Sequence, residues 1–386
     1  MNQKGEFILT KNKAEVNGKN YFYEINFIRA IACLCVVMVH VTAGYYYEND
    51  KTFDMITQFF NQITRYGTPA FAIISGFLLN NQLINKRFKM HSFLKSRLTK
   101  IVIPFVIWSF IYLILKTIYG YYSFPSWNIV EIKEFIYFFS IGKAHYHLYF
   151  ISVVIQFYII FILLRYLHSK NSLLILTIAA FFLNYFFIEL KFNFGSGVFN
   201  NLMNERAFIF RWIFYFLFGG LLVYYWHRIV AWVKKNIRLN LLIVAVVMIA
   251  GCFEYKYTGF LTSTRTLNLI NLPLLFIALT GVYFALKRFE NIRDIFIRIG
   301  NFSMGIYLVH PFVLFFLREY DIFKFLYKST WYLPLLFLFT LAASLLIVKL
   351  ISILPLGNYV VTVASLPNKN LKTQSANKMH TSFTSN

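Results

Sequence analysis

The chain has 386 residues, of which 59% are hydrophobic, 20% aromatic and 14% charged, with a formal net charge of +23. This composition excludes a water-soluble globular protein and is typical of a polytopic membrane protein. The positive charge falls in short loops between apolar runs, where membrane topology accounts for it. We therefore expect membrane lipids, and not nucleic acid, as partners.

Apolar runs long enough to span a bilayer recur about ten times and predict an all-α membrane domain over residues 25–353. A polar tail, 1–24, precedes this domain. The tail 354–386, rich in Ser, Thr, Asn and Lys, is expected to be disordered. The first run exceeds a signal-peptide core and shows no evident small-residue cleavage site, which predicts a retained anchor helix. The predicted spans are 25–47, 57–79, 101–120, 147–166, 172–189, 207–226, 239–256, 268–286, 302–318 and 331–353.

Lys and Arg are more numerous in the two tails and in the loops after the even-numbered spans than in the other loops. Because cytoplasmic loops carry the excess of these residues, both termini are predicted to be cytoplasmic. An even number of spans agrees with this orientation.

The first span carries two ionisable residues, Arg29 and His40, eleven positions apart. In a helix this spacing places both on one face, about 16 Å apart along the axis. An arginine at depth in lipid costs about 2.5–3.5 kcal/mol, so such a residue is a functional hypothesis by default. The pair predicts a site for a charged substrate with a reactive group further along.

Other spans carry polar residues of the same kinds. Arg65 and Arg211 lie near the ends of spans two and six, His310 lies near the middle of span nine, and His147 stands with His145 at the entry to span four. A neutral histidine can take a proton from a sugar hydroxyl, and an arginine can hold a phosphate or an oxyanion. The plainer interpretations are an interhelical hydrogen bond for His310 and snorkelling to the interface for the arginines.

Acidic residues fall in tails, loops or span ends, which argues against a carboxylate-based proton pump and a hard-cation site. Cys33, Cys35 and Cys252 all lie in apolar runs and suit neither a disulfide framework nor a metal cluster. No metal site and no bound cofactor are therefore expected.

Six segments together resemble a known family. The segment 24–40 is similar to the first helix of the membrane-bound acyltransferase family 3, which carries an Arg-x10-His pair at the spacing of Arg29 and His40. The further resemblances follow in order: 67–78 ending in Ser-Gly-Phe-Leu, the basic segment 93–100 before Pro104, 146–150 reading Tyr-His-Leu-Tyr-Phe, Arg211 with 216–220, and 303–311 containing Tyr-Leu-Val-His-Pro.

The resemblance implies transfer of an acyl group, expected to be acetyl, from cytoplasmic acyl-CoA as co-substrate to a hydroxyl of a cell-surface or lipid-linked glycan. It implies a multi-pass protein of the bacterial plasma membrane that lacks an added extracytoplasmic domain. His40 and Arg29 would then be catalytic. Lys95, Arg97 and Lys100 would bind the donor, and Arg65, His147, Arg211 and His310 would bind or support the acceptor.

The chain departs from the family pattern at two positions. Asn26 stands where the family often has Asp, which removes an acid partner for Arg29, and Lys100 replaces an arginine of the basic loop. The alternative interpretations are an exporter or flippase of a lipid-linked glycan or biofilm polysaccharide, and a scaffold for a polysaccharide synthase. The basic loop discriminates between the acyltransferase and the exporter or flippase, because only an acyl-CoA enzyme needs it.

Overall fold

The computed structural model describes residues 15–16, 19–85, 88–126, 128–190, 195 and 198–364. It divides into a helical unit, Glu24–Val363, and a unit of the two chain ends, Met1–Tyr23 with Ala364–Asn386. Of the latter, the structure describes two short antiparallel strands, β1 (Glu15–Val16) and β2 (Lys19–Asn20). The prediction of disorder falls mainly on 365–386, which lie outside the described residues.

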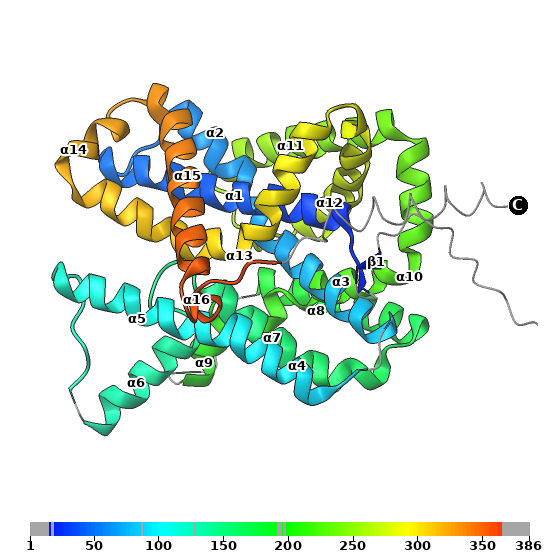
Figure 1. Ribbon diagram of the computed structural model, residues 1–386, viewed down its shortest axis with the longest axis horizontal. Coiled ribbons are helices and arrows are strands. Elements are labelled where there is room, and N and C mark those ends of the chain that lie inside the picture. Colours follow the sequence, from blue (N-terminus) through cyan, green and yellow to red (C-terminus); the bar gives the residue numbers. More distant parts are fainter. Residues whose placement is uncertain are drawn as a thin grey trace, which may run out of the picture. The chain divides into compact units, whose positions relative to one another are not determined.

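All other elements are helices, shown in Figure 1. The α-helices are α1 (Tyr23–Glu48), α2 (Met55–Ile63), α3 (Gly67–Asn85), α4 (Met90–Arg97), α5 (Ile103–Ile118), α6 (Ile129–Ser140), α7 (Tyr149–Leu164), α8 (Lys170–Glu189), α9 (Val198–Asn204), α10 (Ile213–Lys235), α11 (Ile237–Thr258), α12 (Asn268–Ala285), α13 (Glu290–Glu319), α14 (Asp321–Lys324), α15 (Leu333–Ile353) and α16 (Gly357–Val360). The shorter turns are η1 (Thr64–Tyr66), η2 (Leu98–Val102), η3 (Arg165–Leu167), η4 (Ile209–Arg211), η5 (Leu286–Arg288), η6 (Phe325–Tyr327) and η7 (Thr330–Tyr332).

Within the described ranges, nine helical stretches are long and apolar enough to cross a membrane. They are Tyr23–Glu48, Met90–Ile118, Tyr149–Leu167, Lys170–Glu189, Phe199–Lys235, Ile237–Thr258, Asn268–Arg288, Glu290–Glu319 and Thr330–Ile353. The all-α, polytopic membrane architecture predicted from the sequence is confirmed.

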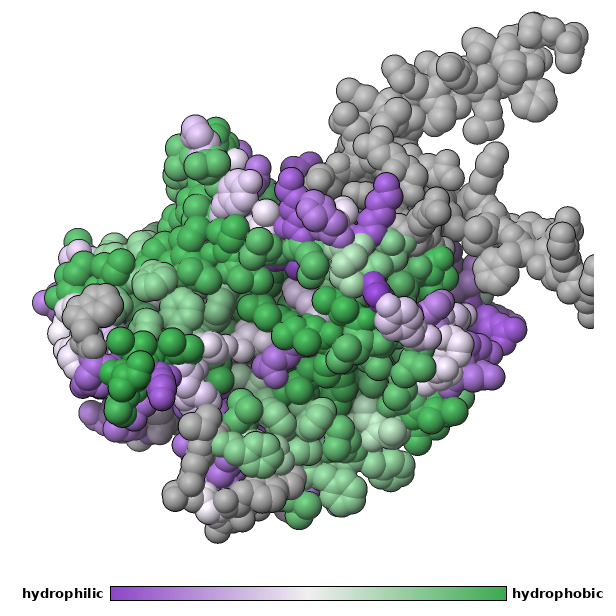
Figure 2. Space-filling model, turned by 90° about the horizontal axis from the view of Figure 1, so that it is seen from below, coloured by the Kyte–Doolittle hydropathy of each residue, from purple (hydrophilic) through white to green (hydrophobic). Residues whose placement is uncertain are grey.

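Large apolar side chains cover the outside of several of these helices. Figure 2 shows hydrophobic residues over much of one face, interrupted by hydrophilic groups. Ile175 of α8, Leu242 of α11 and Leu338 of α15 are each more than half exposed. Contiguous apolar surface of this kind is unusual on a water-soluble monomer and suits contact with lipid.

The second predicted span, 57–79, has a different structure. The chain forms the short helix α2, capped by Asp54, which accepts from the amides of Ile56 and Thr57, and then breaks at η1 before α3 begins. Asn80, Asn81 and Gln82 near the end of α3 lower its hydropathy, and α3 is not among the nine stretches. Among the described side chains of α3 only that of Ile84 is exposed, because the helix packs against α10.

Two glycines allow this close packing. A Cβ on Gly76 of α3 would lie 1.8 Å from the carbonyl oxygen of Phe216, and one on Gly219 of α10 would lie 2.0 Å from that of Ile73. Small residues let the backbones of membrane helices approach in this way. The α3–α10 contact thereby fixes η1, which precedes α3 and carries Arg65.

Helix α1 lies in the interior of the helical unit, which explains why its sequence is apolar on all sides. Asn26 donates through Nδ2 to the carbonyl oxygen of Ile297 at 2.7 Å and to Oδ1 of Asn301 at 2.9 Å, both on α13. At the other end, Tyr45 donates its hydroxyl to the carbonyl of Leu326 at 2.8 Å. These bonds fix the start of α1 on α13 and its end on η6, the turn at Leu326, so the position of His40 between them is defined.

Candidate active site

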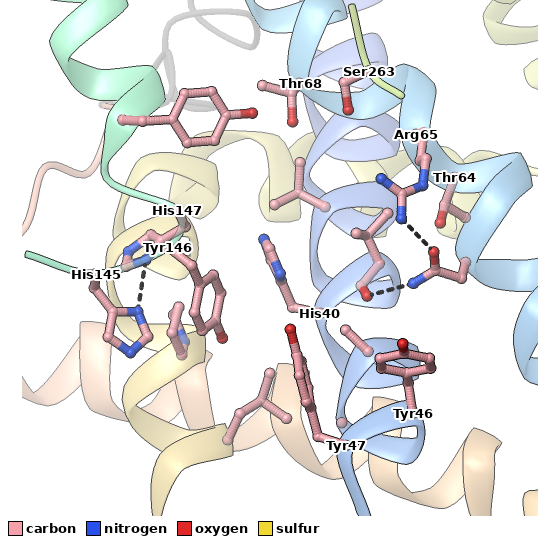
Figure 3. Close-up of a pocket in the computed structure, with 18 of the residues that line it drawn as sticks. His40, Tyr46, Tyr47, Thr64, Arg65, Thr68, His145, Tyr146, His147 and Ser263 are labelled. Carbon is pink, nitrogen blue, oxygen red and sulfur yellow. Dashed lines mark hydrogen bonds between the residues drawn. The ribbon is translucent and has the colours of Figure 1, made fainter. Parts of the chain in front are cut away.

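A cavity of about 550 Å³ lies against the C-terminal half of α1. Its walls come from α1 between Val36 and Tyr47, from η1 and the start of α3, from the loop 141–148, from the α11–α12 loop, and from α13. The volume falls in the range of small-molecule sites. Figure 3 shows His40 projecting into this cavity between the segment 145–147 and Arg65.

His40 presents its imidazole to the cavity. Its ring centroid lies 4.6 Å from that of Tyr146 and 5.3 Å from that of His310, whose ring stacks on it at an interplanar angle of 28°. Within the part of the chain that the structure describes, no hydrogen bond to His40 is recorded. Its ring nitrogens are therefore available to a substrate.

Two further imidazoles enter from the loop 141–148. Nδ1 of His145 lies 3.2 Å from Nδ1 of His147, and the His147 and His310 ring centroids are 5.6 Å apart. The loop turns sharply at Gly142, where φ is +75° and a Cβ would lie 2.6 Å from the carbonyl oxygen of Leu148. Lys116 donates to the carbonyl of Ala144 at 2.8 Å and helps to fix this turn.

The three imidazoles of His145, His147 and His310 are buried, and burial favours their uncharged forms. Burial, and next the positive charge of Lys116, hold the pKa of His145 well below its ordinary value. One Nδ1 of the His145–His147 pair must then donate while the other accepts. Among the residues described here, no group of three or more His, Cys, Asp and Glu is arranged to hold a metal ion.

The tautomer of neutral His310 follows from its hydrogen bond. Its Nδ1 lies 2.9 Å from the carbonyl oxygen of Ile306, which can only accept, so Nδ1 carries the hydrogen. The bare nitrogen is then Nε2, which is buried without a hydrogen-bond partner. The lone pair on Nε2 is free to accept a proton or a hydrogen bond inside the cluster.

Arg65 forms the opposite side of the cavity. Its Nη2 donates to Oδ1 of Asn61 at 2.7 Å, and its guanidinium lies 4.3 Å from the centroid of the Phe260 ring. Asn61 in turn donates to the carbonyl of Val39 and to the hydroxyl of Thr42, both at 3.0 Å. This network ties Arg65 to α1 close to His40.

Two more arginines line the cavity. Arg206 packs 5.2 Å from the centroid of the Tyr149 ring, and the adjacent Glu205 is engaged instead by Lys143 at 2.5 Å. Arg318 forms an ion pair with Glu48 at 2.9 Å. The cavity's described lining residues include three arginines and no carboxylate.

The structure brings together only some of the residues predicted from the sequence. His40, Arg65 and His147 line the cavity, and His310 stacks on His40. The remaining predicted residues do not line it: Arg29, Lys95, Arg97, Lys100 and Arg211.

Those remaining residues have other surroundings. Arg29 lies three turns before His40 on α1, and Lys95 and Lys100 are exposed on α4 and η2. Arg97 donates to Oε1 of Gln82 at 3.2 Å and packs on the rings of Phe93 and Tyr158. The carbonyl of Arg211 accepts a hydrogen bond from Asn184 at 2.9 Å.

Sequence reasoning did not assign three of the cavity residues: Tyr146, Arg206 and Arg318. Tyr146 lies between two histidines that the sequence singles out, and that adjacency is a usable signal. Arg206 sits in an irregular turn before η4 and Arg318 in the last turn of α13, where a basic residue is ordinary. Nothing in their local sequence distinguishes these two arginines from the other cations of the chain.

Comparisons with known proteins bear on the chemistry of this site. Residues 22–349 match acyltransferase family 3, whose model is described as an acyltransferase domain. A relative from Staphylococcus aureus (strain MRSA252), named probable poly-beta-1,6-N-acetyl-D-glucosamine export protein, is 28% identical over 309 residues, which cover 75% of this chain and 82% of the relative. A protein of the same name from Staphylococcus epidermidis is 27% identical over 313 residues, covering 75% and 81%. No solved structure matches the chain.

Proposed function

This chain belongs to acyltransferase family 3, and we propose that it transfers an acyl group, acetyl in the first instance, from acyl-CoA to a hydroxyl of a cell-surface or lipid-linked glycan. The proposal places it in a bacterial plasma membrane with both termini in the cytoplasm, which requires α2 and α3 to form a tenth crossing beside the nine stretches. The observation that carries it is the position of His40, whose imidazole faces a cavity of about 550 Å³ beside further imidazoles and guanidinium groups.

His40 acts as the general base in this proposal. A ring nitrogen takes the proton of the acceptor hydroxyl as its oxygen attacks the thioester carbonyl carbon. The new C–O bond forms, the C–S bond breaks, and the leaving thiolate takes the proton from the imidazolium to give the thiol. Products are an ester and free CoA, with no net gain or loss of protons.

The surrounding groups support this transfer. His310 and His147 keep the base in a cluster of imidazoles, and Arg65 faces the reacting atoms from the other side. A guanidinium there binds and orients the acceptor glycan. Asn184 links the carbonyl of Arg211 to the amide of Phe214, so we assign Arg211 a supporting role at the start of α10.

The donor is proposed to enter from the half of α1 that carries Arg29. The cavity occupies only the His40 half of that helix, so it is the acceptor side of the site. Lys95, Arg97 and Lys100 lie on α4 and η2, where cations suit the phosphates of CoA. The pantetheine arm would then reach past Arg29 towards His40.

Export of a polysaccharide is the second candidate function. The observation that favours it is the printed name of the relatives, probable poly-beta-1,6-N-acetyl-D-glucosamine export protein. An exporter needs a polar path with arginines and aromatic side chains, which the cavity also offers. It does not need a base, nor the cations Arg97 and Lys100.

Whole cells separate the two candidates. A deletion strain is compared with strains that carry the wild type or the double variant Arg97→Gln/Lys100→Gln, and ester-linked acyl groups are read by NMR on glycans extracted without alkali. Acyl transfer predicts loss of one acyl ester at unchanged polymer amount, restored by the wild type and not by the double variant. Loss of surface polymer with intact acylation, restored by both, would establish export instead.

A further inference from the structure

Two arginines of the cavity lack a carboxylate partner. Arg318 is neutralised by Glu48, whereas Arg65 binds the neutral amide oxygen of Asn61, and no carboxylate contact to Arg206 is recorded in the described part of the chain. The carboxylate next in sequence, Glu205, is engaged by Lys143. Two positive charges therefore face a cavity whose described lining offers no negative one.

These two charges act on one another. Burial, and next the positive charge of Arg206, hold the pKa of Arg65 below its ordinary value, so the two guanidinium groups are close enough to repel one another. Arg65 is part-buried, Arg206 is exposed, and both line the cavity. An anionic group that enters the cavity would therefore meet two guanidinium groups that no described carboxylate neutralises.

The rest of this side of the cavity suits an anion as well. Each guanidinium packs near an aromatic ring, that of Arg65 near Phe260 and that of Arg206 near Tyr149. Hydroxyl-bearing residues, Thr68 and Ser263, line the cavity on the same side as Arg65 (Figure 3). Guanidinium and hydroxyl groups donate hydrogen bonds to the oxygens of phosphate and carboxylate groups.

We infer that Arg65 and Arg206 form a subsite for an anionic group, phosphate or carboxylate, that the acceptor glycan or its lipid carrier bears near the hydroxyl to be acylated. The inference rests on the proposed function only in naming the acceptor as the ligand. With such a subsite, the preferred acceptor is a charged glycan or a lipid-linked glycosyl phosphate. A neutral sugar is a poor acceptor. His40 would then act on a hydroxyl held by this anion.

Binding of small probes tests the subsite without any acyl donor. Dissociation constants are measured by ligand-detected NMR on the full chain in lipid nanodiscs with N-acetylglucosamine, N-acetylglucosamine 1-phosphate and glucuronic acid. We expect at least one anionic sugar to bind tenfold or more tightly than the neutral sugar. Preference for the glycosyl phosphate indicates a lipid-linked acceptor, and preference for the uronic acid indicates a carboxylate within the glycan. Saturating coenzyme A is expected to leave the preference unchanged.

Variants assign the preference to the two arginines. Arg65→Gln and Arg206→Gln should each abolish it, whereas the corresponding lysine variants retain part of it. Asn61→Asp supplies a carboxylate to Arg65 and should also abolish it, although both arginines remain. Arg165→Gln removes a guanidinium that packs on Tyr166 outside the cavity and should change nothing.

Two results would overturn the inference: no difference between neutral and anionic sugars in the wild type, or a preference that survives in both glutamine variants. His40→Ala separates this inference from the proposed function, because it should keep the anion preference while losing acyl transfer. If the preference is found but the wild type transfers no acyl group to any acceptor, the anion subsite stands and the proposed function fails.

Discussion

The imidazoles of His40 on α1 and His310 on α13 stack with their ring centroids 5.3 Å apart. Because His310 commits its Nδ1 hydrogen to the carbonyl of Ile306, its buried Nε2 is the atom left to interact within the cluster. A second positive charge beside protonated His40 is unfavourable at this distance. His310 is therefore expected to stay neutral while His40 carries the proton.

Substitution of His310 tests the role of Nε2. An asparagine amide nitrogen can replace Nδ1 and donate to Ile306, but His310→Asn has no atom at the position of Nε2. We expect His310→Asn to unfold at the same temperature as the wild type. Its rate of acyl transfer should be lower than that of the wild type by about tenfold or more, because Nε2 takes part in proton transfer. Initial rates with radiolabelled acetyl-CoA in reconstituted vesicles measure this.

His310→Gln is the matched control, because its longer side chain places a polar atom near Nε2 and loses the Nδ1 bond. It should lose stability and keep more activity than His310→Asn. If His310→Asn transfers acyl groups at the wild-type rate, the imidazole serves only to hydrogen-bond Ile306 within α13.

Adjacent glycines on α10 differ in what surrounds them. A Cβ on Gly219 would lie 2.0 Å from a backbone carbonyl oxygen of α3, whereas the nearest atom to one on Gly220 is Cβ of Asn80 at 3.6 Å. Gly219→Ala should therefore push α3 and α10 apart and lower the thermal midpoint and the yield of folded protein. Gly220→Ala should be neutral or stabilising, since alanine is favoured over glycine in a helix by about 1 kcal/mol.

Heating detergent-solubilised protein and measuring the monodisperse fraction by gel filtration compares the two variants. Equal midpoints for Gly219→Ala and Gly220→Ala would contradict the close approach of α3 and α10.

Asn26 is a structural link between α1 and α13. Asn26→Asp removes both Nδ2 donors and points a carboxylate at two acceptors, on Ile297 and Asn301. Leaving buried acceptors unpaired costs roughly 1–3 kcal/mol, so the thermal midpoint at pH 7 should fall.

The thermal midpoint is compared with that of Asn236→Asp, whose amide makes an exposed hydrogen bond to the carbonyl of Trp232 in the last turn of α10. An Asn26→Asp midpoint no lower than that of the control would contradict the assigned bonds.

Much of the fold was predictable because membrane helices must be long and continuously apolar. That signal located α1 and the other spanning stretches. It did not predict that the segment 57–79 breaks at η1 and packs its second helix, α3, against α10, because the same apolar residues suit contact with lipid and with protein. The break at η1 and the burial of α3 against α10 depend on glycine contacts between distant segments, and hydropathy does not record those contacts.

The candidate site was predictable where the chemistry is unusual for a membrane span. His40 and His310 stand out for that reason, and the structure stacks their rings. Arg206 was not predictable, because an arginine in a loop is ordinary until the fold brings it to the cavity that Arg65 also lines. The predicted donor residues, Lys95, Arg97 and Lys100, are placed outside the cavity, and their role stays a prediction.

The most direct measurement is the transfer of radiolabelled acetyl groups from acetyl-CoA to glycan by wild type, His40→Ala and His227→Ala in membrane vesicles. His227 is an exposed histidine of α10 that does not line the cavity, so its variant is the matched control. We predict that the wild type and His227→Ala label the glycan, and that His40→Ala labels it at least a hundredfold less. Wild-type labelling by folded His40→Ala protein would contradict the assignment of His40 as the base.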